Sequence, residues 1–359
     1  MPNRVCSFVL ILVLASGVLS SCGNTERGPV NPIHPDAKLS DADFFQMAEE
    51  LSELATSKKT AVIEGYPTVG VVMPTLNHPG WIATYAGVLK GAIKNKAGVL
   101  AFSADEDVEL QISIIEDLIA KKVDGIIFVP TDSEALSESV KKANAAKIPI
   151  VSLDRSTTGG KLDGLVESDN VEIGREAARQ MAVLSDGKRL RIFNLQGNLA
   201  TSAGIERNNG FVEEISKYND CRIVKEIHGF WKAERGNSAV LEAFKTNPEI
   251  NAIFIPSDLY LQGVIAALDQ LGRLRPVDDP AHVILVSVDG QPIGIENIRK
   301  EYVNVDVGQR LITMGEQAFD MCVTIINGDE IKNNDVKIPP EVINKDNIDS
   351  REFWGNRFR

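Results

Sequence analysis

Basic charge, aromatic side chains, cysteine and histidine are all scarce in this sequence. Lys and Arg number 38 against 50 Asp and Glu, and the formal net charge is −12 at neutral pH. A surface of this sign repels phosphate backbones and offers no basic patch, so we expect no nucleic-acid partner. The four histidines show no metal-ligand spacing, and no Gly-x-Ser-x-Gly elbow, phosphate-binding loop or paired-cysteine motif occurs. The sequence therefore predicts no metal site, no cofactor and no catalytic activity.

Cysteine is too scarce for a disulfide framework. Cys6 and Cys22 both belong to the N-terminal segment, so only Cys221 and Cys322 are left to pair. These two lie far apart in the chain and, in the fold argued below, in different lobes. We therefore expect two buried free thiols, with a disulfide as the less favoured alternative.

The one long apolar run lies at the N terminus and is short for a membrane span. Residues 5–19 follow a single arginine and are apolar apart from small side chains, which is typical of a signal peptide core. The Leu-Ser-Ser-Cys motif at residues 19–22 resembles the bacterial lipobox, which implies that Cys22 becomes lipidated. We predict residues 1–21 as a signal peptide and Cys22 as a lipid anchor on the outer face of a bacterial membrane. The alternative is an ordinary secretory signal with a stray cysteine.

Residues 22–66 contain two segments of different composition. Three prolines among polar residues predict a flexible tether over residues 23–38. Ser40 then caps an expected helix whose apolar side chains share one face, and we predict that it packs on the body as a surface helix rather than binding a partner. Nothing in this segment resembles a helix-turn-helix.

After Pro67 short apolar runs alternate with amphipathic stretches long enough for helices. The chain has 359 residues and is 43% apolar, enough for two cores of ordinary domain size. This alternation predicts an α/β fold of two doubly wound parallel sheets, with the carboxyl ends of the strands at one edge of each sheet. The predicted strands are residues 69–73, 99–102, 125–129 and 148–153 in the first sheet, and residues 190–195, 223–227, 252–255 and 283–288 in the second.

Polar residues gather where these runs stop. Asp154 and Arg155 stand side by side after the run 148–153, at the kind of edge where open α/β sheets bind ligands. A carboxylate and a guanidinium there can accept and donate hydrogen bonds to one polyol, so they predict capture of a small polar molecule. The alternative is a salt bridge that fixes a loop. Similar polar groups follow the other runs, including His78, Ser168, Arg207, Ser257 and Asp289.

In order and spacing, these motifs resemble those of the type I periplasmic binding proteins, most of all the ribose-binding members of the sugar-binding branch. The resemblance covers about residues 66–346. It implies two lobes joined by three hinge crossings, near residues 166–169, 305–309 and 336–338, with a ligand buried between the lobes. The boundaries that follow are 67–167 plus 309–336 for lobe 1, 168–308 plus 337–346 for lobe 2, and 347–359 for a C-terminal tail.

The resemblance also implies which residues touch the ligand. Asp154 and Arg155 match the pair that grips sugar hydroxyls from lobe 1, and Arg207 and Asp289 match the opposing pair from lobe 2. Gln309 matches the hinge amide. The aromatic positions that stack on the sugar ring correspond to Trp81 and Trp231, for which plain core packing is the alternative.

Three positions depart from the ribose pattern. His78 and Ser257 each stand where an asparagine is expected, and Gly80 replaces a second aromatic residue. The lost aromatic adds room, which favours a pyranose, a polyol or a sugar derivative over ribose. His78 and Ser257 remain candidate ligand contacts, and the alternative for His78 is a surface polar residue.

Together these motifs predict a monomeric, lipid-anchored solute receptor that closes around a sugar-like molecule and delivers it to an ABC importer. The alternative is a receptor for a sugar or a furanose-like signal that passes its occupancy to a membrane chemoreceptor or sensor kinase. Asp154 and Asp289 are similar to the two catalytic carboxylates of a glycosidase. The family resemblance implies instead that both residues bind the ligand and catalyse no reaction.

Overall fold

The computed structural model describes Ala48 and residues 66–357. The predicted signal peptide, Cys22, the tether and all of the predicted surface helix except Ala48 lie outside the described residues. Ala48 is helical and fully buried against the core of the first lobe. Within the described part of the chain, no helix has the length and apolar character needed to cross a membrane.

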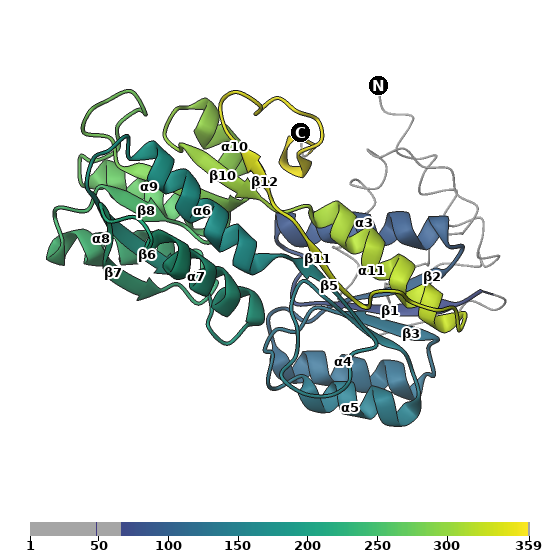
Figure 1. The fold of residues 1–359 in the computed structure, drawn as a ribbon. Helices are drawn as coiled ribbons and strands as arrows, with labels where there is room; N and C mark the ends of the chain where they lie inside the picture. Colours follow the sequence, from purple (N-terminus) through teal and green to yellow (C-terminus); the bar gives the residue numbers. More distant parts are fainter. Residues whose placement is uncertain (1–47, 49–65, 358–359) are drawn as a thin grey trace, which may run out of the picture.

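Lobe 1 is a six-stranded sheet in the order β11-β5-β4-β3-β1-β2, parallel throughout. Its helices cover both faces, α3 and α11 on one and α4 and α5 on the other (Figure 1). The strands are β1 (Thr68–Met73), β2 (Gly98–Ser103), β3 (Gly125–Phe128), β4 (Ile150–Leu153), β5 (Gly164–Ser168) and β11 (Asp335–Ile338). The helices are α3 (Pro79–Lys94), α4 (Val108–Ala120), α5 (Ser137–Ala146) and α11 (Leu311–Ile326).

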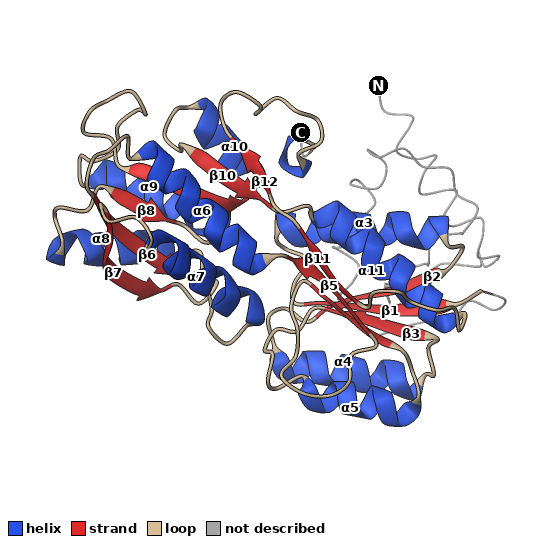
Figure 2. Cartoon of the chain, in the orientation of Figure 1, coloured by secondary structure: helices blue, strands red, loops and turns tan. Residues whose placement is uncertain are grey.

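Lobe 2 repeats this plan in the order β12-β10-β9-β8-β6-β7. Helices α6 and α7 cover one face of the sheet, and α8, α9 and α10 pack on the other (Figure 2). The strands are β6 (Leu190–Gln196), β7 (Cys221–His228), β8 (Ala252–Phe254), β9 (Ile284–Asp289), β10 (Val305–Gly308) and β12 (Glu341–Ile343). The helices are α6 (Asn170–Leu184), α7 (Ser202–Ile215), α8 (Arg235–Thr246), α9 (Leu261–Gln270), α10 (Pro292–Arg299) and the short turns η1 (Asp258–Tyr260) and η2 (Trp354–Asn356).

The predicted fold class is confirmed, with four further strands. Each predicted run became a strand, because an apolar run with helices on both sides is buried on both faces of a parallel sheet. Three of the additional strands, β5, β10 and β11, lie at the predicted hinge crossings. The fourth is β12, which pairs antiparallel with β10. It is only three residues long and only Ile343 of it is buried, so it carries too little apolar signal to be recognised.

The chain crosses between the lobes three times, between β5 and α6, between β10 and α11, and between β11 and β12. The predicted boundary between residues 336 and 337 is wrong. All four residues of β11 pair with β5, as far as Ile338 with Ser168, so lobe 1 continues to Ile338. The last segment is also no free tail, since Phe353 and Trp354 are buried.

Close helix packing sets the position of α7. A Cβ added at Gly174 of α6 would lie 2.1 Å from the Arg207 carbonyl oxygen, and one at Gly210 would lie 2.1 Å from that of Val171. Glycine at both places lets the two helix backbones touch, so α7 presents Arg207 at a depth that larger side chains would prevent.

Both described cysteines are free, as predicted, but only Cys322 is also buried as predicted. Cys221 lies half-buried on β7 in lobe 2, and Cys322 is buried on α11 in lobe 1. Burial raises the pKa of each thiol, which keeps both protonated and unreactive.

Candidate functional site

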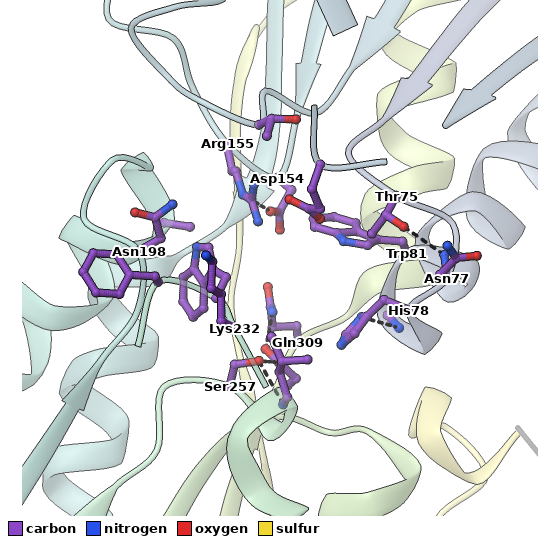
Figure 3. A pocket seen from close by; sticks show the side chains of 18 of the residues that line it. Thr75, Asn77, His78, Trp81, Asp154, Arg155, Asn198, Lys232, Ser257 and Gln309 are labelled. Atoms are coloured by element: carbon purple, nitrogen blue, oxygen red, sulfur yellow. Dashed lines mark hydrogen bonds and ion pairs between the residues drawn. The ribbon is translucent and has the colours of Figure 1, made fainter. Parts of the chain in front are cut away.

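A cavity of about 490 Å³ lies between the two lobes, at the facing carboxyl ends of their sheets. The structure brings all nine predicted site residues to its walls (Figure 3). They are His78, Trp81, Asp154, Arg155, Arg207, Trp231, Ser257, Asp289 and Gln309. Gly80, the position of the missing aromatic, lines it as well.

Asp154 and Arg155 form the lobe 1 wall directly after β4. Arg155 Nε lies 3.4 Å from Asp154 Oδ2, and an Arg155 NH1 group donates to the Pro130 carbonyl oxygen at 3.2 Å. Both residues are buried. Among the described residues, the Asp154 carboxylate accepts no hydrogen bond and is paired with Arg155 alone, so its oxygens keep acceptor capacity toward the cavity.

Burial also changes the protonation of Asp154. The loss of water raises the pKa of its carboxyl, while Arg155 and Arg207 oppose that shift. Arg155 belongs to lobe 1 and Arg207 to lobe 2, so cations of both lobes favour the charged form of this acid against the effect of burial.

Asp289 lies opposite, at the end of β9, and its carboxylate accepts from four protein groups. Oδ1 accepts from Gln309 Nε2 at 2.6 Å and from Arg207 at 3.4 Å. Oδ2 accepts from Ser257 Oγ at 2.6 Å and from Gln291 Nε2 at 3.2 Å. Because a carboxylate has about four acceptor positions, Asp289 is nearly saturated and acts as the hub of the lobe 2 wall.

Arg207 is held in place by a residue to which the sequence assigned no role. Asn170 Oδ1 accepts from Arg207 NH2 at 2.7 Å and from Nε at 3.3 Å. Asn170 is fully buried at the start of α6, directly after the first hinge crossing. Its place two residues after Ser168, at the end of a strand, was the available signal, but the partner lies on another helix and only the fold brings the two together.

The two tryptophans face the cavity from different lobes, and each lies near an arginine. The Arg155 guanidinium is 5.2 Å from the Trp81 ring centroid, and that of Arg207 is 5.9 Å from the Trp231 ring centroid. These are cation–π distances, which orient each indole. Trp231 also donates its backbone N–H to the Tyr260 hydroxyl at 2.8 Å.

His78 caps helix α3 as well as lining the cavity. Its Nδ1 accepts from the Gly80 backbone N–H at 3.2 Å, and its Nε2 lies 3.3 Å from the Gln291 amide nitrogen of lobe 2. Burial lowers the pKa of His78, with Asp289 opposing the shift. The ring is therefore held neutral, the form in which Nδ1 can accept the capping hydrogen bond.

The lobes touch directly on the other side of the cavity. Ser156 N donates to Ser202 Oγ at 2.9 Å, Ser202 N donates to Ser133 Oγ at 3.2 Å, and Ser133 N donates to the Ala200 carbonyl oxygen at 3.3 Å. Ser133 and Ser156 follow strands of lobe 1, and Ser202 begins α7 of lobe 2. We call these three hydrogen bonds the serine contact; they close the lobes over the cavity.

Sequence reasoning missed several cavity residues because they lie on loops without a periodic signal. They include Thr75, Asn77, Glu106, Thr131, Asp132, Asn198, Phe230 and Lys232. Gln291, a neighbour of Asp289, was missed as well; its amide nitrogen donates to Asp289 Oδ2 and lies 3.3 Å from His78 Nε2 of lobe 1. Among the residues that the structure describes, no group of three or more His, Cys, Asp or Glu is arranged to hold a metal ion.

Two α/β lobes with three crossings and a polar cavity between them define the architecture of a solute-binding protein. The family model for the periplasmic binding protein domain matches residues 69–330, and the chain belongs to this family. It is a family of solute-binding proteins and not of enzymes.

Individual relatives place the chain in the sugar-binding branch. The ribose import binding protein RbsB of Bacillus subtilis is 30% identical over 267 residues, which cover 74% of this chain and 83% of that protein. The D-allose-binding periplasmic protein of Escherichia coli is 26% identical over 268 residues, covering 71% and 80%. A solved ABC transporter solute-binding protein from Actinobacillus succinogenes with bound D-allose has a TM-score of 0.72 and 26% identity, covering 79% of this chain and 99% of that one.

Proposed function

We propose that this protein captures a sugar or sugar-like polyol in the interlobe cavity and delivers it to an ABC importer. The observation that carries the proposal is the pairing of an acid and a base from each lobe, Asp154 with Arg155 and Asp289 with Arg207, around one cavity. The Asp154 carboxylate accepts from the hydroxyls of a polyol and the guanidinium groups of Arg155 and Arg207 donate to them, while Asp289 holds Arg207 in place; each charge-assisted hydrogen bond contributes roughly 1.5–3 kcal/mol.

The walls favour a neutral ligand with apolar ring faces. Acidic and basic side chains line the cavity together, so no single charge sign dominates it. Two indoles supply flat apolar surfaces suited to sugar C–H groups. A Cβ added at Gly80 would lie 3.2 Å from His78 Nδ1 and 3.3 Å from Leu311 Cδ1, so protein atoms fill the space beside this glycine and it does not favour a larger sugar.

The direct test is a thermal-shift screen over pentoses, hexoses, polyols, nucleosides and furanose signals, followed by calorimetry on the hits. A ligand at about 100 times its dissociation constant adds roughly 2.7 kcal/mol of stability. We expect at least one neutral hexose or polyol to raise Tm. A screen in which only charged compounds or nucleosides act would contradict the proposal.

Delivery to an importer is tested by reconstitution. The protein loaded with the hit sugar should stimulate the ATPase activity of a cognate permease complex in vesicles, because closure presents both lobes together. If the loaded protein stimulates a sensor kinase or chemoreceptor and not the transporter, the protein acts in sensing and the import proposal is wrong.

We further propose that Cys22 is lipidated and anchors the chain. The support is the Leu-Ser-Ser-Cys motif at residues 19–22, after an apolar segment typical of a signal peptide. Cys22→Ser should move the protein from the membrane fraction to the soluble exported fraction. Unchanged membrane association of this variant would rule the anchor out.

A further inference from the structure

The last described residues, 347–357, pack where the two lobes meet. Trp354 is 2% exposed and belongs to the hydrophobic cluster of lobe 1 that contains Leu76 and Leu311. The preceding Phe353 belongs instead to the lobe 2 cluster with Ile348. Figure 1 shows η2 between α10 of lobe 2 and α3 of lobe 1. Two consecutive aromatic residues therefore anchor this segment in different lobes.

The segment is also tied down by polar contacts. Arg299 of α10 donates from NH2 to Asp349 Oδ1 at 2.9 Å and to Asn356 Oδ1 at 3.0 Å. The Asn356 amide donates to the carbonyl oxygens of Ile348 at 2.7 Å and Ser350 at 2.8 Å. These bonds fold the segment into a compact loop that holds Trp354 in one orientation.

Trp354 reaches the backbone of a cavity residue. Its indole Nε1 donates to the Asp289 carbonyl oxygen at 2.8 Å. A Cβ added at Gly355 would lie only 2.3 Å from the Gly290 carbonyl oxygen, so the segment is in close contact with the turn that follows β9.

That turn has a strained backbone. Asp289 has φ 121° and Gly290 has φ 74°. A non-glycine residue in this region persists only where its surroundings hold it. Two buried carboxylates hold the turn from lobe 2: Asp306 Oδ1 accepts from Gly290 N at 2.9 Å, and Asp258 Oδ2 accepts from Gln291 N at 2.8 Å. Trp354 donates to the carbonyl oxygen of the same Asp289–Gly290 peptide, which also accepts from the Gln309 backbone N–H at 3.2 Å; of the three side chains, Trp354 alone belongs to the lobe 1 cluster.

We propose that Trp354 is a positioning residue of the binding cavity: it fixes the strained Asp289 peptide, aims that carboxylate into the cavity and couples its orientation to the closed arrangement of the lobes. The claim that Trp354 affects ligand affinity rests on the proposed sugar-binding function. The claim that Trp354 holds the turn after β9 is independent of that function, because it concerns the backbone alone.

The test compares Trp354→Phe, which keeps an apolar ring and removes the N–H donor, with Phe244→Leu. Phe244 is buried in the lobe 2 cluster on α8, away from the turn, and serves as a matched loss of core packing. The ligand-independent readout is amide hydrogen exchange at Gly290 and Gln291 in the full-length protein. In Trp354→Phe, the amides of Gly290 and Gln291 should exchange about tenfold faster than the loss of global stability alone would cause. In Phe244→Leu, exchange at these two amides should change only as much as global stability does.

The second readout is affinity for D-ribose and D-allose by calorimetry. Trp354→Phe should weaken whichever sugar the unaltered protein binds by about tenfold, with Phe244→Leu within about twofold of it. Exchange rates at residues 290–291 that follow global stability equally in both variants would overturn the proposal. If the unaltered protein binds neither sugar, the affinity comparison uses the sugar found in the thermal-shift screen, while the exchange measurement decides the role of Trp354 without any ligand.

Discussion

Asp154 and Asp289 occupy equivalent places in the two lobes. Asp154 directly follows β4 and Asp289 ends β9, and these strands hold the same position in their sheets. Both have positive φ, 67° and 121°. They differ in their partners, because Asp289 accepts from four protein groups whereas Asp154 is paired with Arg155 alone among the described residues. One carboxylate is therefore left available to a ligand, and the other organises the wall.

Asp154→Asn should weaken binding of the sugar found in the screen by about tenfold to a hundredfold. The amide keeps the shape of the side chain but loses the charge that strengthens each hydroxyl hydrogen bond, at roughly 1.5–3 kcal/mol per bond. Tm without ligand should change little, since the carboxylate accepts no hydrogen bond from the described protein groups and removal of its buried charge offsets the loss of the ion pair with Arg155. Calorimetry and thermal unfolding measure the two effects, and an unaltered affinity would exclude Asp154 from the site.

Asp289→Asn should lower both affinity and ligand-free stability. Its neutral amide presents one oxygen to four donors, so at least two buried donors lose their partner at roughly 1–3 kcal/mol each. The expected contrast with Asp154→Asn is therefore in Tm without ligand. Equal stability of the two variants would show that the four hydrogen bonds do not hold the wall.

His78→Ala should destabilise the protein by about 1 kcal/mol through loss of the α3 cap, whereas His78→Asn, which keeps a capping acceptor, should not. The pKa of His78 is lowered by burial, so the unfolded chain takes up its proton first. The stability that comes from keeping His78 neutral is present above about pH 6.5 and is lost as the pH falls through the lowered pKa of the folded protein. In His78→Asn, Tm should depend less on pH below about pH 6.5. An unchanged dependence of Tm on pH would show that a group other than His78 titrates in this range.

Glu167 should produce a pH dependence of the opposite sign. It is 1% exposed on β5, where burial raises its pKa to about 7 although Lys337 Nζ lies 2.7 Å from Oε1. The folded protein keeps the proton of Glu167 up to about pH 7, whereas the unfolded chain releases it near pH 4.5. Stability therefore falls as the pH rises from about 4.5 to about 7, by at most roughly 3 kcal/mol.

Glu167→Gln should remove the share of the slope that comes from Glu167. Burial also raises the pKa of Asp258 and raises that of Asp306 to about 6, so a slope of the same sign from these two carboxyls should remain in both proteins. The measurement is chemical denaturation between pH 5 and pH 8. A variant with the slope of the unaltered protein would contradict the assignment to Glu167.

Ser202→Ala should weaken ligand binding about threefold to tenfold by removing the acceptor of the Ser156 N–H in the serine contact. Thr201 still caps α7, so the helix keeps its start. Because the lost hydrogen bond exists only when the lobes are closed, the ligand-free protein should open further. Small-angle scattering measures the opening, and a faster dissociation rate should carry the affinity loss. Unaltered scattering and affinity would show that the contact contributes nothing to closure.

Much of the fold was predictable because burial on both faces of a sheet leaves a continuous apolar run in the sequence. The run before Asp154 was expected from residue 148 and begins as β4 at Ile150, an error of two residues at an element end. The nine cavity residues were found because they resemble a family pattern at strand ends. β12 and the packing of residues 347–357 were not found, since a three-residue edge strand and an irregular loop have no periodicity.

Local sequence is sufficient for the strand runs, the helix spacing and the polar strand ends, since these depend on side chains within a few residues of one another. The pairing of Arg207 with Asn170, the saturation of Asp289 and the contact of Trp354 with its carbonyl oxygen depend on residues that are distant in the chain. Such contacts exist only after the chain has packed into its tertiary structure, because each partner is positioned by a different helix, strand or loop.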